Sequence, residues 1–142
     1  MKISTPRACG GTLKTVVLDS HVLYWWSQDA AMVSRTATRA ITEADELLVA
    51  DITWYELAWL ATHGRIGASV PLHRWLSELA EGVRTIPVTP AIAAAAAGLP
   101  PTFPSDPADR LIYASAVELG ARLVTRDERM RAHPAERPVT LW

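Results

Sequence analysis

Short apolar runs alternate with longer amphipathic or alanine-rich stretches from Thr15 to the end of the chain. The stretches with helical spacing predict helices near 20–27, 34–44, about 54–63, about 69–81, 91–98 and 107–119. The apolar runs predict strands at 15–19, 47–50, 84–88, 121–125 and 139–141. Strands and helices that alternate through short links predict an α/β fold. Its central sheet is expected to be mostly parallel, with helices on both faces.

Glycine and proline mark the ends of these predicted helices. Gly64, Gly82, Gly98 and Gly120 each follow a helical stretch, where glycine commonly ends a helix. Thr89 precedes a proline in the way a helix-capping residue does, and Asp106 does so before the helix at 107–119. The helix boundaries therefore have local chemical support.

The chain has 142 residues, the size of one ordinary domain. Hydrophobic residues make up 49% and charged residues 20%, a composition that favours a folded protein over a disordered one. Residues 1–14 show no periodicity and contain Pro6, Gly10 and Gly11, so we expect a flexible leader. Residues 15–142 are expected to form a single domain.

The sequence contains no apolar stretch near the roughly 20 residues that a membrane helix needs. It also lacks an N-terminal signal-peptide pattern. The single cysteine, Cys9, excludes an intrachain disulfide and a cysteine-based zinc site. We therefore expect a cytoplasmic protein without a membrane anchor.

Four acidic residues stand at related points of this pattern. Asp19 and Asp127 close predicted strands, while Glu56 and Asp109 lie at the starts of predicted helices. In open parallel sheets these points meet along one edge, which is where ligands bind. Two carboxylates about 4 Å apart repel by roughly 4 kcal/mol in an intermediate dielectric, so four of them together favour a bound cation. Carboxylates without histidine or cysteine partners suit Mg²⁺ or Mn²⁺, and the four histidines show no ligand spacing.

Each acid taken alone also has a structural interpretation. Thr53 and Glu56 have the spacing of a capping box, in which the glutamate bonds back to the threonine amide. Asp106 is a strong helix-cap candidate, and Asp109 would favourably face the positive end of the helix dipole. Asp51 would either add negative charge to the site or point to solvent. The joint arrangement, more than any single residue, indicates a metal site.

Four segments resemble the motifs of PIN-domain ribonucleases, and more closely of VapC-type toxins from type II toxin–antitoxin systems. The segments are Val17-Leu18-Asp19-Ser20-His21-Val22-Leu23-Tyr24-Trp25-Trp26, Ile52-Thr53-Trp54-Tyr55-Glu56-Leu57-Ala58, Asp106-Pro107-Ala108-Asp109-Arg110-Leu111-Ile112-Tyr113-Ala114-Ser115-Ala116 and Leu123-Val124-Thr125-Arg126-Asp127. The resemblance implies a PIN-like nuclease domain over 15–142 and Mg²⁺- or Mn²⁺-dependent endonucleolytic cleavage of RNA. It implies that Asp19, Glu56, Asp109 and Asp127 are the catalytic, metal-binding acids.

Five further residues have candidate roles near these acids. Ser20 and Thr125 are expected to orient carboxylates through their hydroxyl groups. Asp106 is interpreted mainly as the helix cap, with metal or substrate contact as the alternative. Arg110 would pair with an acid, contact phosphate or form a surface salt bridge. Arg126 would contact RNA or simply be solvated.

The resemblance also implies partners: an RNA substrate, a second copy of the chain in a homodimer, and a VapB-type antitoxin. DNA would be contacted only indirectly, through the antitoxin. Six tryptophans are many for a domain of this size, and Trp is enriched at interfaces. The aromatic residues of the predicted helix at 54–63 and the apolar stripe of the next helix would either form a groove between the two helices or fill the core. They are Trp54, Tyr55 and Trp59, and Leu72, Trp75, Leu76 and Leu79. The net charge of -1 neither supports nor excludes RNA binding.

Three other functions stay open on the sequence. One is a PIN-fold nuclease of RNA processing outside a toxin–antitoxin pair. Another is a non-catalytic protein-interaction domain, in which the acids are helix caps. A phosphoryl-transfer enzyme is the least favoured, because His21 stands where an Asp-x-Asp motif would have its second acid.

Overall fold

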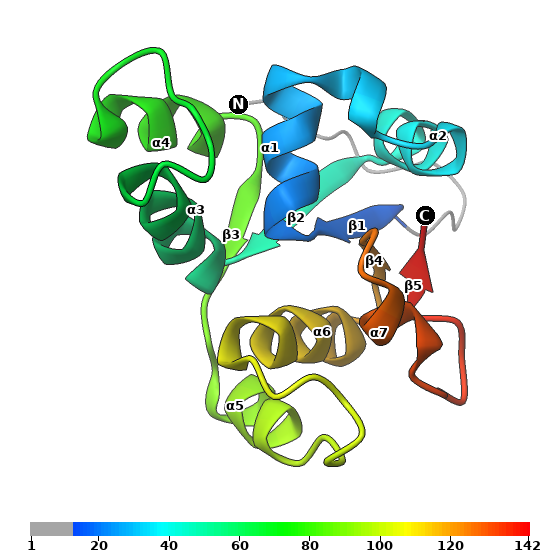
Figure 1. Cartoon of the computed structure of the whole chain (residues 1–142). Coiled ribbons are helices and arrows are strands. Elements are labelled where there is room, and N and C mark those ends of the chain that lie inside the picture. Colours follow the sequence, from blue (N-terminus) through cyan, green and yellow to red (C-terminus); the bar gives the residue numbers. More distant parts are fainter. Residues whose placement is uncertain (1–12) are drawn as a thin grey trace.

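The computed structural model describes residues 13–142 and contains, within them, a five-stranded sheet whose neighbouring strands all pair in parallel. The strand order is β3-β2-β1-β4-β5, so the chain moves outward on one side of β1 and then on the other (Figure 1). The predicted α/β fold is confirmed. Most of the expected leader, 1–14, lies outside the described residues. The strands are β1 (Thr15–Leu18), β2 (Glu46–Ala50), β3 (Arg84–Ile86), β4 (Arg122–Val124) and β5 (Thr140–Leu141).

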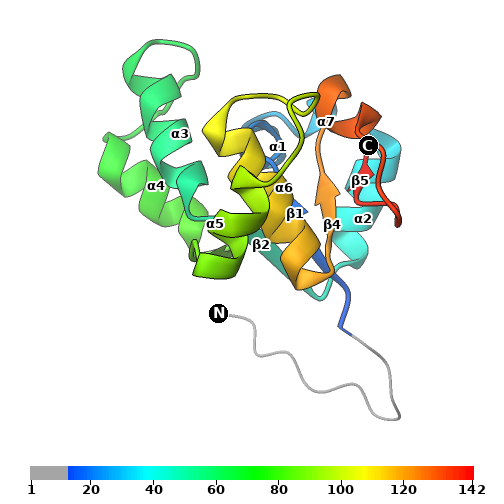
Figure 2. The same cartoon turned by 90° about the horizontal axis from the view of Figure 1, so that it is seen from below.

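Helices cover both faces of this sheet, as the alternating pattern predicts. Figure 1 shows α1 to α4 on one side and α5 and α6 on the other. Figure 2, turned by 90°, agrees that α6 lies between the sheet and α5. The α-helices are α1 (Ser20–Gln28), α2 (Arg35–Glu43), α3 (Ile52–Thr62), α4 (Leu72–Ala80), α5 (Pro90–Ala97), α6 (Pro107–Leu119) and α7 (Glu128–Ala132), with a 3₁₀ turn at Ala30–Met32.

The central strand β1 divides the core into two layers. Val16 and Leu18 pack with α1, α2, α3 and α4, whereas Val17 faces the opposite layer with α5 and α6. All three are buried, which is the pattern of a parallel strand covered on both faces. The sheet is thereby fixed from both sides, and its carboxyl-end loops have a rigid support.

Local capping signals set several helix ends where the sequence predicts them. Thr89 accepts a hydrogen bond from the Ile92 amide, and Pro90 is the first residue of α5. Gly120 ends α6 with φ of 65°, a left-handed conformation that glycine adopts without steric cost. The helix α6 keeps its predicted bounds.

One helix start was predicted wrongly and one short helix was not predicted. The α3 helix begins at Ile52, so Thr53 is inside the helix and buried, not its cap. The five-residue helix α7 was not predicted, because so short a segment shows no apolar period. Within residues 13–142, no helix is long and apolar enough to cross a membrane.

Candidate functional site

A cavity of about 550 Å³ opens where β1 and β4 end side by side. This is the point at which the strand order reverses, the usual ligand position in open parallel sheets. All four predicted acids line it, although α3 and α6 approach from different parts of the chain. The lining residues are Asp19, His21, Trp25, Glu56, Asp106, Asp109, Arg126, Asp127 and Glu128.

Asp19 is the deepest of these acids and is held by two hydrogen bonds. Its Oδ1 accepts from the Ser20 amide at 2.8 Å, and its Oδ2 accepts from the Thr125 hydroxyl at 2.7 Å. Burial raises the pKa of Asp19 above its usual value, while the bonds from Thr125 and Ser20 oppose the rise. The carboxylate is therefore fixed in orientation and costly to keep charged without a cation.

Glu56 does not form the capping box that the sequence suggested. Its Oε1 instead accepts from the Ser20 hydroxyl at 2.5 Å, and Ser20 Oγ also lies 3.1 Å from Thr53 Oγ1. Burial raises the pKa of Glu56, and the charges of Asp19 and Asp106 add to the rise. The residue after the first acid thus orients the second acid across the site.

Glu56, Asp106 and Asp109 form the tightest acidic group among the described residues. One carboxylate oxygen from each lies within 4.8 Å of the other two. Carboxylate oxygens this close together could hold one ion between them. The set consists entirely of oxygen donors, which is what Mg²⁺ and Mn²⁺ prefer.

Asp106 is the cap of α6, and its position also permits the metal contact that the sequence left as the alternative. Its Oδ1 caps α6 by accepting from the amides of Ala108, at 2.7 Å, and Asp109, at 3.4 Å. A carboxylate has a second oxygen, which remains available toward Glu56 and Asp109. Capping and metal contact are therefore compatible for this residue.

Asp109 shows the electrostatic consequence of gathering the acids. Burial raises its pKa to about 7, and the charges of Asp19, Asp106, Glu56 and Asp127 contribute in the same direction. A carboxyl group with this pKa is partly protonated at neutral pH. A divalent cation would compensate the repulsion and favour the ionised form.

Thr125 links the ends of β1 and β4. Its hydroxyl donates to Asp19 Oδ2 and accepts from the Asp127 amide at 3.0 Å. Asp127 in turn caps α7, because its Oδ1 accepts from the Met130 amide at 2.9 Å. The unpredicted helix α7 thus holds Asp127, the fourth acid, at the cavity.

Arg110 forms neither an acid pair nor a surface salt bridge within residues 13–142. Its guanidinium donates to five backbone carbonyls in and before the loop that leads to α6. The loop carbonyls take its donors instead, and contact with a substrate phosphate stays a prediction. Asp51 likewise lies away from the cavity lining, and its Oδ2 accepts from the Val88 amide. The carbonyls bound by Arg110 belong to Ala96, Leu99, Pro100, Phe103 and Pro104.

Three lining residues were not assigned to the site from the sequence: His21, Trp25 and Glu128. His21 and Trp25 are four positions apart on α1, so they share one helix face directly after Asp19. That spacing is a readable signal once the acid before the helix is placed. That no histidine is needed as a metal ligand stays a prediction, although His21 lines the cavity with the acids.

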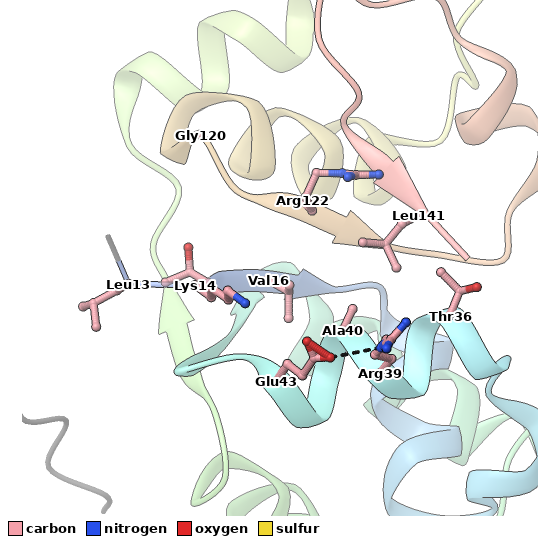
Figure 3. A pocket seen from close by; sticks show the side chains of 11 residues that line it. Leu13, Lys14, Val16, Thr36, Arg39, Ala40, Glu43, Gly120, Arg122 and Leu141 are labelled. Atoms are coloured by element: carbon pink, nitrogen blue, oxygen red, sulfur yellow. Dashed lines mark ion pairs between the residues drawn. The ribbon is translucent and has the colours of Figure 1, made fainter. Parts of the chain in front are cut away.

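A second cavity, of about 470 Å³, lies toward the amino ends of the strands (Figure 3). Glu43 is the one acidic residue in its lining, and its carboxylate pairs with Arg39 at 3.2 Å. This cavity therefore lacks the gathered carboxylates of the other and does not compete as a metal site. It is lined by Leu13, Lys14, Thr15, Val16, Thr36, Arg39, Ala40, Glu43, Gly120, Arg122 and Leu141.

The aromatic residues of α3 and α4 divide between core and surface. Trp75 is buried, with 3% exposure, and packs edge-on against Tyr24. Tyr55 and Trp59 remain 67% and 40% exposed on α3, and Trp59 stacks on His63. Part of the predicted groove thus fills the core, while an exposed aromatic face on α3 remains.

Comparisons with known proteins agree with this geometry. Residues 16–136 match the model of the PIN domain family. The chain is 57% identical over 130 residues to Ribonuclease VapC22 of Mycobacterium tuberculosis (strain ATCC 25618 / H37Rv), covering 92% of this chain and 100% of that protein.

Solved structures of low sequence identity share the fold. A chain of a toxin–antitoxin complex from Klebsiella pneumoniae matches with a TM-score of 0.62 at 19% identity, over 89% of this chain and 96% of that chain. A chain of VapBC2 from Rickettsia felis, bound to a DNA fragment from their promoter, matches with a TM-score of 0.63 at 12% identity. That match covers 89% of this chain and 97% of the other.

Proposed function

Because the chain belongs to the PIN-domain family and, within it, to the VapC ribonucleases, we propose that it is a divalent-metal-dependent endoribonuclease toxin. The observation that carries the proposal is the convergence of Asp19, Glu56, Asp109 and Asp127 in one cavity with Asp106. The raised pKa of Asp109, about 7, supports a site built to receive a cation.

The donor set fits Mg²⁺ or Mn²⁺. Glu56, Asp106 and Asp109 would hold the ion directly, since one oxygen of each lies within 4.8 Å of the others. Asp19 and Asp127 line the same cavity and would help to hold the ion, either directly or through water. A bound divalent ion supplies a water of lowered pKa and stabilises charge on the leaving oxygen of a phosphodiester.

Hydrogen bonds within the protein orient the carboxylates that would hold the ion. Ser20 orients Glu56, and Thr125 orients Asp19, so that two carboxylates are held without freedom to turn away. Without the ion the Asp109 carboxyl group is partly protonated near neutral pH, and binding of the ion would displace that proton. Together these groups position an attacking water and substrate phosphate at one place.

The proposed partners follow from the family and from the exposed α3 face. A VapB-type antitoxin would cover Tyr55 and Trp59, since aromatic side chains are frequent anchors for partner helices. A homodimer and a cytoplasmic location are proposed with it. Contact with promoter DNA would be indirect, through the antitoxin. The structurally similar VapBC2 of Rickettsia felis was solved bound to a DNA fragment from their promoter.

Cleavage of a pool of structured RNAs by antitoxin-free protein tests the proposal. The assay compares Mg²⁺, Mn²⁺ and EDTA, with Asp19→Asn as the inactive variant and Asp29→Asn, an exposed acid at the end of α1, as matched control. We expect discrete metal-dependent cuts by the wild type and the control, and none by Asp19→Asn. A folded wild type that neither cuts RNA nor binds metal would support the alternative of a non-catalytic interaction domain.

A further inference from the structure

One side of the acidic cavity has no part in the metal chemistry proposed above. His21, Trp25 and Arg126 line it together, and we call these three residues the aromatic rim. Two of them come from α1, directly after Asp19, and the third precedes Asp127. The rim therefore adjoins the first and fourth acids along the chain and shares their cavity.

Trp25 is the centre of the rim and is held from several sides. Its ring centroid lies 5.8 Å from that of His21 and 6.0 Å from that of Trp142. The guanidinium carbon of Arg126 lies 5.7 Å from the Trp25 ring centroid. A half-buried tryptophan fixed in this way offers a flat surface that loses little conformational freedom when a second ring stacks on it.

Among the described residues, several arginines use their guanidinium groups in ion pairs or hydrogen bonds, and Arg126 does not. Arg39, Arg74 and Arg84 pair with glutamates, and Arg110 and Arg122 donate to backbone carbonyls. In the described part of the chain, no hydrogen bond or ion pair occupies Arg126, which contacts the Trp25 ring. Its side chain is exposed, and its forked donors suit a phosphate group.

The negative charge of the cavity gives the cationic side chain of Arg126 a role in binding phosphate. Six of the nine lining residues are acidic, so a phosphodiester entering the cavity meets strong negative charge. Arg126 is the one Lys or Arg among the lining residues. A cation at the rim would draw a phosphate into the cavity, next to the acids that would hold the metal ion.

An aromatic plane beside a cation is the combination that recognises an unpaired nucleotide. We propose that the aromatic rim is an RNA subsite, in which Trp25 stacks an unpaired base next to the scissile phosphate and Arg126 contacts a phosphate of that nucleotide. The inference deepens the proposed nuclease function and rests on it. It restricts the substrate to RNA whose cleavage site is single-stranded, such as a loop, because a paired base cannot reach Trp25.

Trp25→Leu and Arg126→Met test the rim, each with a neighbouring control. Trp26→Leu removes the adjacent half-buried tryptophan, which does not line the cavity, and Arg129→Met removes an equal charge from an exposed position on α7. Steady-state cleavage of a loop RNA in Mg²⁺ would give kcat and KM for each. We expect both rim variants to raise KM about tenfold or more, with a smaller effect on kcat, and both controls to stay within about twofold of wild type.

Two readouts separate a direct contact from a structural effect. Arg126→Met should reduce the slope of log KM against log salt concentration by about 0.7, the value for one phosphate contact on a single strand, while Arg129→Met leaves it unchanged. Added RNA should quench tryptophan fluorescence less in Trp25→Leu than in Trp26→Leu. Trp25→Phe and Arg126→Lys should recover part of the affinity, and they extend the test if Trp25→Leu fails to fold.

The outcomes distinguish the subsite from the nuclease itself. Metal-dependent cleavage by wild type, with KM and salt slope unchanged in both rim variants, would overturn the subsite and leave the proposed function standing. Equal cleavage of duplex and loop substrates would overturn it as well. Absence of cleavage by folded wild type on any RNA, with metal present, would instead refute the proposed function.

Discussion

Ser20 Oγ lies 2.5 Å from Glu56 Oε1, although the two residues are 36 positions apart in the sequence. Ser20 is fully buried directly after the first acid, and Glu56 is on α3. This one hydroxyl connects the start of α1, directly after Asp19, to the helix that bears the second acid. The geometry of the site thus depends on a neutral residue as well as on its carboxylates.

Replacing Ser20 by alanine tests that dependence. The variant leaves Glu56 without its donor, and we expect kcat for RNA cleavage to fall roughly 10- to 100-fold, as for other residues that orient metal ligands. Stability should fall by about 1 kcal/mol. Single-turnover cleavage and thermal unfolding measure the two effects. Ser27→Ala, at the exposed end of α1, is the control, and equal kcat in both variants would contradict the orienting role.

The pH dependence of stability without metal follows from the raised pKa values. Asp109, with a pKa of about 7, binds its proton more tightly in the folded state than in the unfolded state. Between pH 4 and pH 7 the folded protein therefore holds more protons, and the unfolding free energy contributed by this group falls as pH rises. Burial raises the pKa of Asp19 and Glu56 in the same direction.

Thermal unfolding in EDTA from pH 4.5 to 8 measures this effect. The wild-type Tm should decline more steeply toward pH 8 than that of Asp109→Asn, which cannot ionise. Asp29→Asn should follow the wild type. Parallel curves for wild type and Asp109→Asn would mean that Asp109 titrates as an ordinary exposed carboxyl group.

Asp106 allows its capping and metal roles to be separated by one substitution. Serine is about as good a helix cap as aspartate but offers no carboxylate. We expect Asp106→Ser to change stability by less than about 0.5 kcal/mol and to weaken Mn²⁺ binding about tenfold or more. Asp106→Ala should lose both, including about 1 kcal/mol of stability. Metal titration by calorimetry decides, and unchanged Mn²⁺ affinity in Asp106→Ser would leave only the capping role.

Arg110 is expected to support the fold rather than the reaction directly. Its guanidinium satisfies five carbonyls, so Arg110→Met leaves several partly buried acceptors without donors. We expect a loss of about 2–4 kcal/mol in unfolding free energy, with little recovery in Arg110→Lys, whose single ammonium cannot reach the same set. Arg74→Met, which removes an exposed pair with Glu78, should cost at most about 0.5 kcal/mol. Urea denaturation compares the three.

The exposed face of α3 gives a prediction about the antitoxin. Tyr55 is 67% exposed, whereas Leu57 on the same helix is fully buried. Tyr55→Ala should weaken binding of a cognate antitoxin about tenfold or more, and leave RNA cleavage by the free protein unchanged. Surface plasmon resonance measures the affinity. Val117→Ser, an exposed apolar residue on α6, is the control, and an equal effect of both variants would argue against an interface on α3.

The sequence was sufficient for the order of the strands and the longer helices because each depends on local chemistry. Apolar runs such as 121–125 and cap pairs such as Asp106-Pro107 encode strands and helix starts within a few residues. The fold class was predicted correctly on that basis, and the family was predicted correctly from the four segments that resemble PIN-domain motifs. The assignment of the four acids as catalytic stays a prediction, although all four line one cavity.

Interactions between distant residues were decided only by the tertiary structure. Thr53 and Glu56 have capping-box spacing, but Ser20 competes for the Glu56 carboxylate once α1 and α3 pack together. Arg110 follows an acid in sequence, yet the carbonyls of the preceding loop take its donors. Local spacing specifies which partners are near along the chain. Local spacing does not show whether a partner brought close by folding will bind instead. Glu56 and Arg110 both bind such partners.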